Sequence, residues 1–548
     1  MDLADVPQHS GRRLDPIVPN LVGPARRHTL DDLLRRAANR APEKTALIGG
    51  GTLWTYAQLD RIIDQLAAGL QASGVEVGDR VALMARNSHW YVALRFAVAR
   101  LGAILVPVNF MLAVDDTAYI LEHSGSRLLL VDGSCAAVAC EAASGMKVGI
   151  IGIPDIHHAE PQNAVVAPFS VINAERTGAP LLPAMIDGSA IAQIIYTSGT
   201  EARPKGAMLS HDALLWEYQS CIAGCDWHSD AIQINALPLF HCAQLDAFLG
   251  PAIQLGATNI ILESPAPDLV LQAIGKYRAT AFFAPPTVWI ALLRSPLFDQ
   301  SALSSLTHGF YGASIMPVQI LRELMERLPA VKWYNCYGQT EIAPVATILG
   351  PEDQVRKAGS AGRAVMHVET RVVDASMRDV PPGEVGEIVH RSPQLMSGYW
   401  NDAARTEAAF AGGWFHSGDL AVMDEEGFLT IVDRKKDMIK TGGENVASRE
   451  VEELLYRMPG ISEVAVIGLP HPRWIEMVTA FVVPRSGHIL DEASIIAHSR
   501  SVMSSFKAPK RVVIVDGLPK NASGKILKRQ LREHPEALKI IAEEETGQ

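Results

Sequence analysis

Short apolar runs alternate with helix-like segments over most of the chain, and this alternation constrains the fold more than any other feature. From Arg80 onward, helical spacing around 90–101 and 115–123 separates the strand-like runs VALMA, AILVPVN and RLLLVDG. Past residue 230 the rhythm resumes with INALPL, TNIILES, TAFFAPP and THGFYGA. Such alternation predicts an α/β fold with a parallel, doubly wound sheet. The spacing of the runs is not fixed, so a solenoid is not favoured.

Two changes of pattern predict further parts of the molecule. Between Gly359 and Gly398, short strand-like runs such as GRAV, TRVVD and GEVGEIVHR are separated by glycine, which indicates a small β-rich subdomain. After the charged segment Asp433–Asp437 a new βα pattern begins. At 548 residues the chain exceeds one ordinary core. We therefore expect a large N-terminal domain, residues 1–435, and a small, mobile α+β C-terminal domain, residues 436–548.

Composition excludes several classes of function. Sixty acidic against 49 basic residues give a net charge of −11, which offers no general attraction for nucleic acid. The six cysteines form no CxxC pair, so neither a zinc site nor a disulfide framework is indicated. We find no signal pattern at the N-terminus and no apolar run of about 18 residues. The expected location is cytoplasmic, without a transmembrane segment; peripheral membrane contact and homo-oligomers remain open.

The segment YTSGTEARPKG, Tyr196–Gly206, combines hydroxyls, glycines and two cations. An apolar run enters it and a helix-like segment opening near Ser210 leaves it, which predicts a strand, a loop and then a helix. Hydroxyls, backbone N–H groups and cations in such a loop can hold the oxygens of a polyphosphate. It is not a Walker A loop, because Lys205 is followed by Gly206 rather than Ser or Thr. The alternative is a mobile surface turn.

The segment NCYGQTE, 335–341, is a second candidate part of a nucleotide site. It places the Tyr337 ring shortly before the Thr340 hydroxyl and the Glu341 carboxylate. A ring that stacks on a purine, a hydroxyl on phosphate and a carboxylate on Mg²⁺ would complete an ATP site. The alternative is a core tyrosine and a solvated glutamate.

Three further segments carry candidate residues. In WFHSGDLA, Asp419 follows a glycine, and its carboxylate can accept both ribose hydroxyls; otherwise it is a turn residue. The basic segment VDRKKDMIKTGGEN, 432–445, taken alone, is typical of a solvated linker. In LPKNASGKILKRQL, Lys525 lies in a basic, Gly-containing turn, where a lysine is ordinarily a surface residue.

Taken together and in this order, the five segments resemble the adenylate-forming superfamily of acyl-CoA synthetases, peptide-synthetase adenylation domains and luciferases. The resemblance runs from about Thr29 to Glu533, nearly the whole chain. It implies roles for residues at the matching positions. The implied phosphate loop comprises Thr197, Ser198, Gly199, Thr200 and Lys205. The other implied nucleotide contacts are Tyr337 beside Gly312 and Ala313 at adenine, Thr340 at the α-phosphate, Glu341 on Mg²⁺, and Asp419 with nearby Arg434 at the ribose.

The resemblance also implies residues that act beyond the nucleotide. Lys525 aligns with the adenylation lysine of the family, and Lys436 with the hinge between its domains. His241, in LPLFHCAQLD, falls where the family has an aromatic or His residue that closes the acyl pocket; the alternative is a core histidine. The turn Gly442–Gly443 aligns with the lining of the thiol tunnel.

The expected activity is that of an ATP-dependent ligase. Such a ligase would activate a hydrophobic carboxylic acid, expected to be a fatty acid, as acyl-AMP and transfer the acyl group to CoA. The sequence LPLFHC lacks the Asp that amino-acid-activating members commonly carry, and Phe282 and Phe283 suit an alkyl or aryl acid. The alternatives are an aryl acid substrate, a carrier-protein thiol as acceptor, and a non-catalytic nucleotide sensor.

Overall fold

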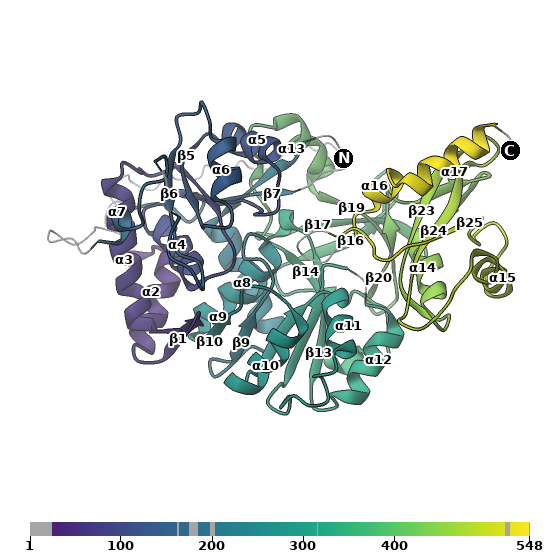
Figure 1. The fold of residues 1–548 in the computed structure, drawn as a ribbon, viewed down its shortest axis with the longest axis horizontal. Coiled ribbons are helices and arrows are strands. Elements are labelled where there is room, and N and C mark those ends of the chain that lie inside the picture. Colours follow the sequence, from purple (N-terminus) through teal and green to yellow (C-terminus); the bar gives the residue numbers. More distant parts are fainter. Residues whose placement is uncertain are drawn as a thin grey trace, which may run out of the picture.

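The computed structural model of the chain describes residues 25–161, 164–174, 185–197, 203–314, 316–520 and 526–546. Four β-sheets with surrounding helices make up this part of the chain (Figure 1). The predicted α/β class, with a large N-terminal part of βα subdomains, is confirmed. No helix among the described residues is both long enough and apolar enough to span a bilayer.

A seven-stranded sheet carries the first strands of the alternation. In spatial order it contains β18 (Gly398–Tyr399), β8 (Lys205–Ser210), β7 (Ile191–Thr197), β4 (Ile104–Pro107), β3 (Arg80–Met84), β5 (Ser126–Val131) and β6 (Gly149–Gly152). The five strands β7, β4, β3, β5 and β6 pair in parallel. At one edge, β8 pairs antiparallel with β7, and β18 pairs antiparallel with β8. Buried aliphatic side chains fill both faces, as a doubly covered parallel sheet requires.

A nine-stranded sheet carries the later part of the alternation. It contains β15 (Arg363–Ala364), β14 (Val345–Leu349), β13 (Lys332–Gly338), β12 (His308–Gly312), β11 (Ala281–Ala284), β9 (Ile232–Asn235), β10 (Thr258–Ile261), β1 (Thr45–Gly49) and β2 (Thr52–Thr55). The six strands from β13 to β1 are parallel, and antiparallel strands close both edges.

Helices cover the two large sheets. In the N-terminal part the α-helices are α2 (Leu30–Arg40), α3 (Tyr56–Ala72), α4 (His89–Arg100), α5 (Val114–Ser124), α6 (Ala136–Ala142), α7 (Ser170–Asn173), α8 (His211–Gly224), α9 (Gly250–Leu255), α10 (Pro267–Tyr277), α11 (Pro286–Arg294), α12 (Val318–Arg327) and α13 (Ala403–Ala409). A π-helix, η1 (Ala243–Leu249), leads directly into α9. Short 3₁₀ turns are η2 (Thr340–Ile342), η3 (Pro351–Asp353) and η4 (Ala411–Gly413).

The predicted β-rich subdomain corresponds to a four-stranded antiparallel sheet. It contains β16 (Glu369–Val373), β17 (Val385–Arg391), β19 (Phe415–Met423) and β20 (Leu429–Arg434). The strand of the run GRAV, β15, pairs with β14 at the edge of the nine-stranded sheet, and Gly362 at the start of the run also forms a bridge to Leu429 of β20. Local sequence cannot distinguish these edges, because the pairing partner of a short strand is set by tertiary contacts.

The last part of the chain forms its own sheet at one side of the molecule (Figure 1). Its strands are β22 (Glu444–Val446), β21 (Ile439–Thr441), β24 (Ile475–Pro484), β23 (Ile461–His471) and β25 (Arg511–Ile514). Its helices are α14 (Ser448–Tyr456), α15 (Glu492–Val502), α16 (Lys528–Arg532) and α17 (Pro535–Thr546). Asp433 of β20 accepts hydrogen bonds from the backbone N and the hydroxyl of Ser448, both 2.7 Å. The exact boundary between the domains stays a prediction.

The helix predicted to open near Ser210 is confirmed as α8, but the prediction of a strand, a loop and then a helix missed a second strand between the Tyr196–Gly206 loop and that helix. Strand β8 follows the loop and pairs antiparallel with β7, and α8 begins only at His211. Ser210 caps that helix, because its hydroxyl accepts a hydrogen bond from the N–H of Ala213 at 3.1 Å. The loop therefore connects two paired strands, and its two ends are held together.

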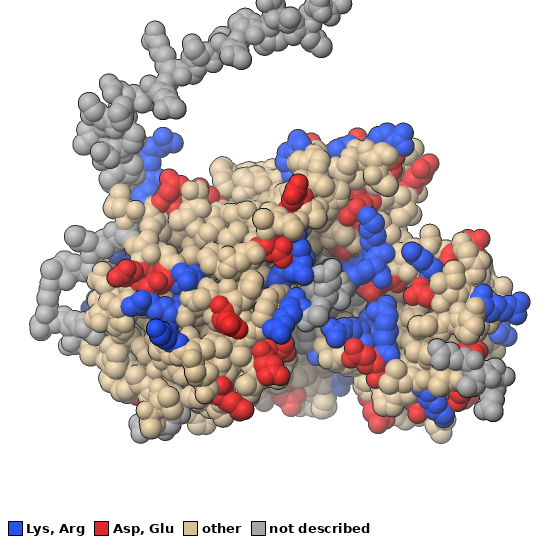
Figure 2. All heavy atoms as spheres, turned by 90° about the horizontal axis from the view of Figure 1, so that it is seen from above, with Lys and Arg blue, Asp and Glu red and all other residues tan. Residues whose placement is uncertain are grey.

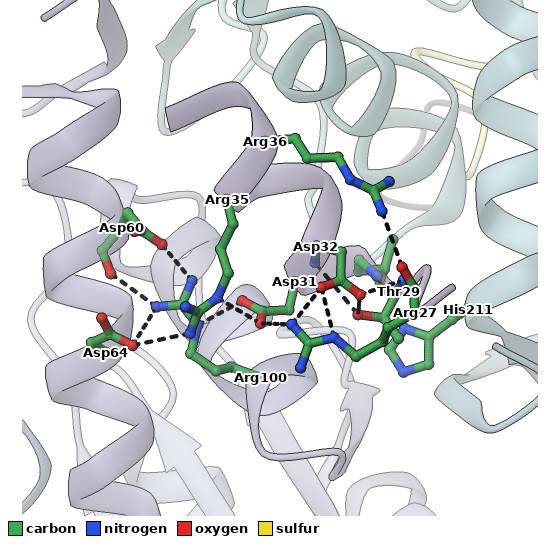
Figure 3. Close-up of polar contacts among 11 residues, drawn as sticks. Arg27, Thr29, Asp31, Asp32, Arg35, Arg36, Asp60, Asp64, Arg100 and His211 are labelled. Carbon is green, nitrogen blue, oxygen red and sulfur yellow. Dashed lines mark hydrogen bonds and ion pairs between the residues drawn. The ribbon is translucent and has the colours of Figure 1, made fainter. Parts of the chain in front are cut away.

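Buried charges fasten helix α2 to the body of the molecule. Arg100 of α4 is fully buried and bonds to three carboxylates, those of Asp31, Asp60 and Asp64, at 2.6, 2.5 and 2.7 Å (Figure 3). The hydroxyl of Thr29 and the carboxylate of Asp32 form a capping box at the start of α2. Helices α2, α3 and α4 are thereby joined through one guanidinium group.

Candidate active site

The two ends of the predicted phosphate loop lie side by side. Thr197, the last residue of β7, is paired with Lys205, the first residue of β8. The Thr197 hydroxyl is buried and has no hydrogen-bond partner in the described part of the chain. A buried hydroxyl in this state suits an added oxygen ligand such as a phosphate. The predicted loop residues Ser198, Gly199 and Thr200 lie outside the described residues.

Helix α5 contacts both flanks of this loop. On the entry side, His123 Nδ1 is 2.8 Å from the hydroxyl of Tyr196. On the exit side, the Tyr119 hydroxyl donates to the carbonyl of Pro204 at 3.1 Å, and the Arg203 guanidinium lies 4.8 Å from the centre of the Tyr119 ring. Side chains of one helix thus fix the loop's entry and exit.

Lys205 reaches Glu341 through Tyr399. The Lys205 ammonium donates to the Tyr399 hydroxyl at 2.9 Å, and that hydroxyl donates to Glu341 Oε1 at 2.8 Å. Burial raises the pKa of Tyr399, and the negative charge of Glu341 raises it further, so the phenol stays protonated. The predicted phosphate cation and the predicted metal ligand are therefore brought to one place by a third residue.

Thr340 and His241 meet at Cys242. The Thr340 hydroxyl lies 3.2 Å from Cys242 Sγ, and His241 Nδ1 lies 3.8 Å from the same sulfur. The N–H of Ala243 donates to His241 Nδ1 at 3.2 Å. Burial raises the pKa of the Cys242 thiol, which therefore stays protonated. The residue predicted to contact the α-phosphate and the residue predicted to close the acyl pocket thus lie within one short chain of contacts.

Tyr337, Asp419 and Arg434 form a second group. The Tyr337 hydroxyl donates to Asp419 Oδ2 at 2.8 Å, and Arg434 Nε lies 3.1 Å from Asp419 Oδ1. Strand pairing of β19 with β20 places Asp419 directly opposite Arg434. Burial raises the pKa of Tyr337 well above its ordinary value, with a further rise from the Asp419 charge. A buried carboxylate held by these two partners is oriented to accept hydroxyl donors such as those of a ribose.

Gly312 and Ala313 lie beside Tyr337. Gly312 ends β12 opposite Cys336, the residue before Tyr337. A Cβ on Gly312 would lie 2.2 Å from the Cys336 carbonyl oxygen, so only glycine fits there. Ala313 is exposed and has a φ of +61°, in the left-handed region. Gly312 therefore packs against the strand that carries Tyr337, and Ala313, the next residue, has only a methyl side chain.

The remaining predicted residues belong to the end of the chain. Burial lowers the pKa of Lys436, the positive charge of Arg434 lowers it further, and Asp419 and Lys205 are also close enough to affect it. Gly442 and Gly443, with φ values of +60° and +90°, form the tip of the β21–β22 hairpin. Figure 2 shows a hollow between the N-terminal part of the molecule and its C-terminal part, with Lys and Arg side chains on both sides. Lys525 lies outside the described residues.

The π-helix η1 continues from His241 and is anchored by a buried ion pair. Arg95 and Asp246 are 1% and 0% exposed, and Arg95 Nη2 lies 2.5 Å from Asp246 Oδ1. Arg95 also donates to the Leu245 carbonyl at 2.7 Å, and the amide of Gln193 donates to Asp246 Oδ2 at 2.7 Å. π-Helical turns are frequent at functional sites. The ion pair therefore fixes the segment that carries the His241–Ala243 contacts.

Glu217 is a further buried carboxyl group close to this ion pair. Burial raises its pKa well above the ordinary 4.5, the hydrogen bond from the Cys221 thiol opposes the rise, and the Asp246 charge adds to it. A raised pKa in the folded state adds stability below pH 4.5 that is lost as pH rises through the folded pKa.

Glu217→Gln should therefore remove part of the loss of stability at high pH. The amide keeps an acceptor for Cys221 but cannot ionise. The free energy of unfolding of the variant, relative to the unchanged protein, is expected to rise with pH by up to about 1.4 kcal/mol per pH unit. Denaturant unfolding between pH 5 and 9 measures this difference. If the free energy of unfolding changed with pH in the same way for both proteins, the pKa of Glu217 would not be raised by folding.

Comparison with known families agrees with this geometry. Residues 34–400 match the family model of the AMP-binding enzymes. The chain is an AMP-binding enzyme. Residues 450–525 match the model of the AMP-binding enzyme C-terminal domain. The predicted resemblance to the adenylate-forming superfamily is confirmed.

Relatives of this AMP-binding enzyme span almost its whole length. Feruloyl-CoA synthase of Amycolatopsis sp is 37% identical over 497 residues, 91% of this chain and 97% of that protein. The long-chain-fatty-acid–CoA ligase of Escherichia coli O6:H1 is 33% identical over 545 residues, 94% and 96% of the two chains. The solved structure of the anthranilate CoA ligase AuaEII in complex with anthranoyl-AMP has a TM-score of 0.84 at 26% identity, covering 92% of this chain and 97% of that one. The predicted class, an AMP-forming acid–thiol ligase, is confirmed.

Several residues at this site were not identified from the sequence. Tyr399 contacts both Lys205 and Glu341, Tyr119 and His123 hold the flanks of the phosphate loop, and Cys242 contacts Thr340. Only Tyr399 carried a local signal, an aromatic residue after a glycine in SGYW. The others become visible only when distant segments are brought together.

The residues of this AMP-binding enzyme fit a magnesium ion shared with substrate phosphates. In nucleotide sites Mg²⁺ is held by one or two carboxylates together with phosphate oxygens and water. Glu341 supplies one carboxylate, 7% exposed. In the described part of the chain no three His, Cys, Asp or Glu side chains are grouped as a metal site. An ion at Glu341 would therefore take its other ligands from ATP and water.

Proposed function

We propose that this AMP-binding enzyme activates a hydrophobic carboxylic acid with ATP and transfers the acyl group to the thiol of CoA. The proposal rests on two groups that one short segment joins: Tyr337, which contacts Asp419, lies four residues before Glu341, which is linked to Lys205 through Tyr399. Lys205 and Glu341 suit the phosphates, and the group of Tyr337 suits the nucleoside. The phosphates and the nucleoside of ATP thus each have side chains that can bind them.

The first half-reaction supplies the leaving group that a carboxylate lacks. The carboxylate attacks the α-phosphorus, the acyl-phosphate bond forms and pyrophosphate departs. Thr197 and Lys205 hold the departing phosphates, Thr340 orients the α-phosphate, and Lys525 stabilises charge at the reacting centre. Mg²⁺, when bound, neutralises negative charge on the phosphate oxygens. Asp419 and Tyr337 fix the nucleoside so that the attack is in line.

The second half-reaction requires a thiol at the acyl carbon. In the proposal the C-terminal part rotates about Lys436, so that Lys525 leaves and the Gly442–Gly443 turn approaches. The CoA thiol then loses its proton to solvent and attacks the acyl carbon, and AMP departs with the electron pair of the broken acyl–oxygen bond. The positive φ values of both glycines support a tight hairpin tip without side chains, past which a narrow thiol arm can pass.

The acid substrate is proposed to be aromatic. The Phe248 ring of η1 stacks on Phe283, with ring centres 4.1 Å apart, and Phe310 lies 5.1 Å from Phe248. These rings belong to the same cluster as Ala243 and Tyr337. The relatives named for ferulate and anthranilate support an aryl acid, whereas the E. coli relative supports the fatty acid expected from the sequence. Phe282 packs instead against Trp289 in another cluster.

A panel of acids tests this proposal. Hydroxycinnamates, benzoates, indole-3-acetate and fatty acids of 8 to 16 carbons are each supplied with ATP, Mg²⁺ and CoA, and kcat/KM for thioester formation is measured. The best aryl acid is expected to exceed the best fatty acid by at least about tenfold, the ratio that one to three kcal/mol of pocket contacts supplies. A preference for fatty acids would overturn the substrate class, and turnover only with a carrier-protein thiol would overturn the acceptor.

A further inference from the structure

Tyr399 has no role in the reaction outlined above, although it touches two groups assigned to ATP. Its hydroxyl accepts a hydrogen bond from the Lys205 ammonium and donates one to the Glu341 carboxylate. The ammonium also lies 4.4 Å from the centre of the Tyr399 ring. A single uncharged side chain therefore separates a cation from an anion.

We propose that Tyr399 is a positioning residue that keeps Lys205 and Glu341 from forming a direct ion pair. Both charged groups then remain available, Lys205 to the phosphates and Glu341 to the metal ion bound with them. The inference rests on the proposed function, because it concerns the same ATP site.

Without the Tyr399 hydroxyl between them, the Lys205 ammonium and the Glu341 carboxylate would form an ion pair. Among the described residues, Lys205 and Glu341 form no direct ion pair, although both bond to the same phenol oxygen. Attraction between opposite charges strengthens as water is excluded, and Glu341 is almost fully buried. A lysine side chain is flexible enough to close the gap. The phenol prevents this closure, because it satisfies the donor and the acceptor separately.

The backbone holds Tyr399 between Lys205 and Glu341. Strand β18 pairs with β8, which places Tyr399 opposite Ala207, two residues beyond Lys205. The N–H of Tyr399 donates to the Thr406 hydroxyl at 2.9 Å, and the N–H of Trp400 donates to the Gly206 carbonyl at 2.8 Å. The position of the ring thus depends on backbone contacts that substitution of the hydroxyl leaves intact.

Tyr399→Phe removes only the hydroxyl. Lys205 and Glu341 are then expected to pair directly, and ATP must break that pair before it can engage Lys205. The affinity for ATP should fall by about tenfold or more, the cost of one charge-assisted hydrogen bond. The loss should depend on the negative charge of Glu341, because Glu341→Gln removes the competing partner of Lys205.

The test is a binding cycle that needs no turnover. The dissociation constant for ATP is measured by calorimetry, in EDTA without metal, for the unchanged protein, Tyr399→Phe, Glu341→Gln and the double variant. Tyr399→Phe alone is expected to weaken binding by about tenfold. In the Glu341→Gln background the same change should have little effect. Tyr56→Phe, which removes a buried hydroxyl bonded to the Ala257 carbonyl at 2.6 Å, is the matched control and should bind ATP normally.

Two results would overturn the inference while leaving the proposed function intact. One is unchanged ATP affinity in Tyr399→Phe. The other is an equal loss in both backgrounds, which would indicate that the hydroxyl only supports the local fold. A protein that binds no ATP before any substitution would instead contradict the proposed function, and the inference with it.

Discussion

Lys525→Ala is expected to slow acyl-adenylate formation by about a hundredfold to a thousandfold, the usual cost of removing one group that stabilises transition-state charge. Negative charge builds on the α-phosphate as the carboxylate attacks, and the lysine ammonium is proposed to offset it. Thioester formation from supplied acyl-adenylate and CoA should proceed at the unchanged rate, because in the proposed mechanism the lysine leaves the site before the thiol attacks. Single-turnover assays of each half-reaction measure the two rates separately.

The matched control for this variant is Lys539→Ala. Lys539 is an exposed lysine on α17, in the same C-terminal part of the chain. It should leave both half-reactions unchanged, which excludes a general effect of lost positive charge. Equal slowing of both half-reactions in Lys525→Ala would contradict the role assigned to that residue.

Arg95→Met is expected to destabilise the folded protein by about 3–5 kcal/mol, because it leaves the Asp246 carboxylate buried without its cation. Burial already raises the pKa of Asp246, and Arg95 opposes that rise. Without Arg95 the carboxylate must take up a proton or draw in water. Because Asp246 belongs to η1, the change should also disturb the His241 segment. Denaturant unfolding measures the stability, and the KM for the acid substrate reports on the pocket.

An exposed ion pair provides the control for this prediction. Arg294 and Glu323 are 40% and 28% exposed, and the pair lies on the surface of α11 and α12. Arg294→Met should cost less than about 1 kcal/mol, because solvent screens such pairs. The double variant Arg95→Met, Asp246→Leu should recover part of the lost stability, since no unpaired charge remains. A loss in Arg95→Met no larger than in Arg294→Met would contradict the importance of the buried pair.

The strand–helix alternation was sufficient to predict the α/β class, and the short motifs together with the resemblance to a known superfamily pointed to most residues of the candidate site. Apolar runs that alternate with helical spacing indicate which segments are buried, and this is visible in local sequence. Tyr337, Asp419 and Arg434 lie in separate motifs, yet the structure joins them by direct contacts. The resemblance to a known superfamily supplied their grouping, which spacing alone could not.

What the sequence did not indicate depends on contacts between distant segments. Strand β8 is only six residues long and lies directly before a helix signal, so no local pattern marked it. Tyr399 acquires its neighbours through the pairing of β18 with β8. Arg95 and Asp246 look like ordinary surface charges in the sequence, and their burial becomes apparent only when α4 packs beside η1. Such tertiary effects override local propensity.

We expect this AMP-binding enzyme to form an acyl-adenylate from ATP and a carboxylic acid. Exchange of labelled pyrophosphate into ATP, measured without CoA over a panel of aryl and alkyl acids, tests this claim most directly. Because adenylation is reversible, exchange should appear only when a suitable acid is present, and Glu341→Gln should reduce it strongly. No acid-dependent exchange with any acid of the panel would contradict the claim and favour a protein that binds nucleotide without activating an acid.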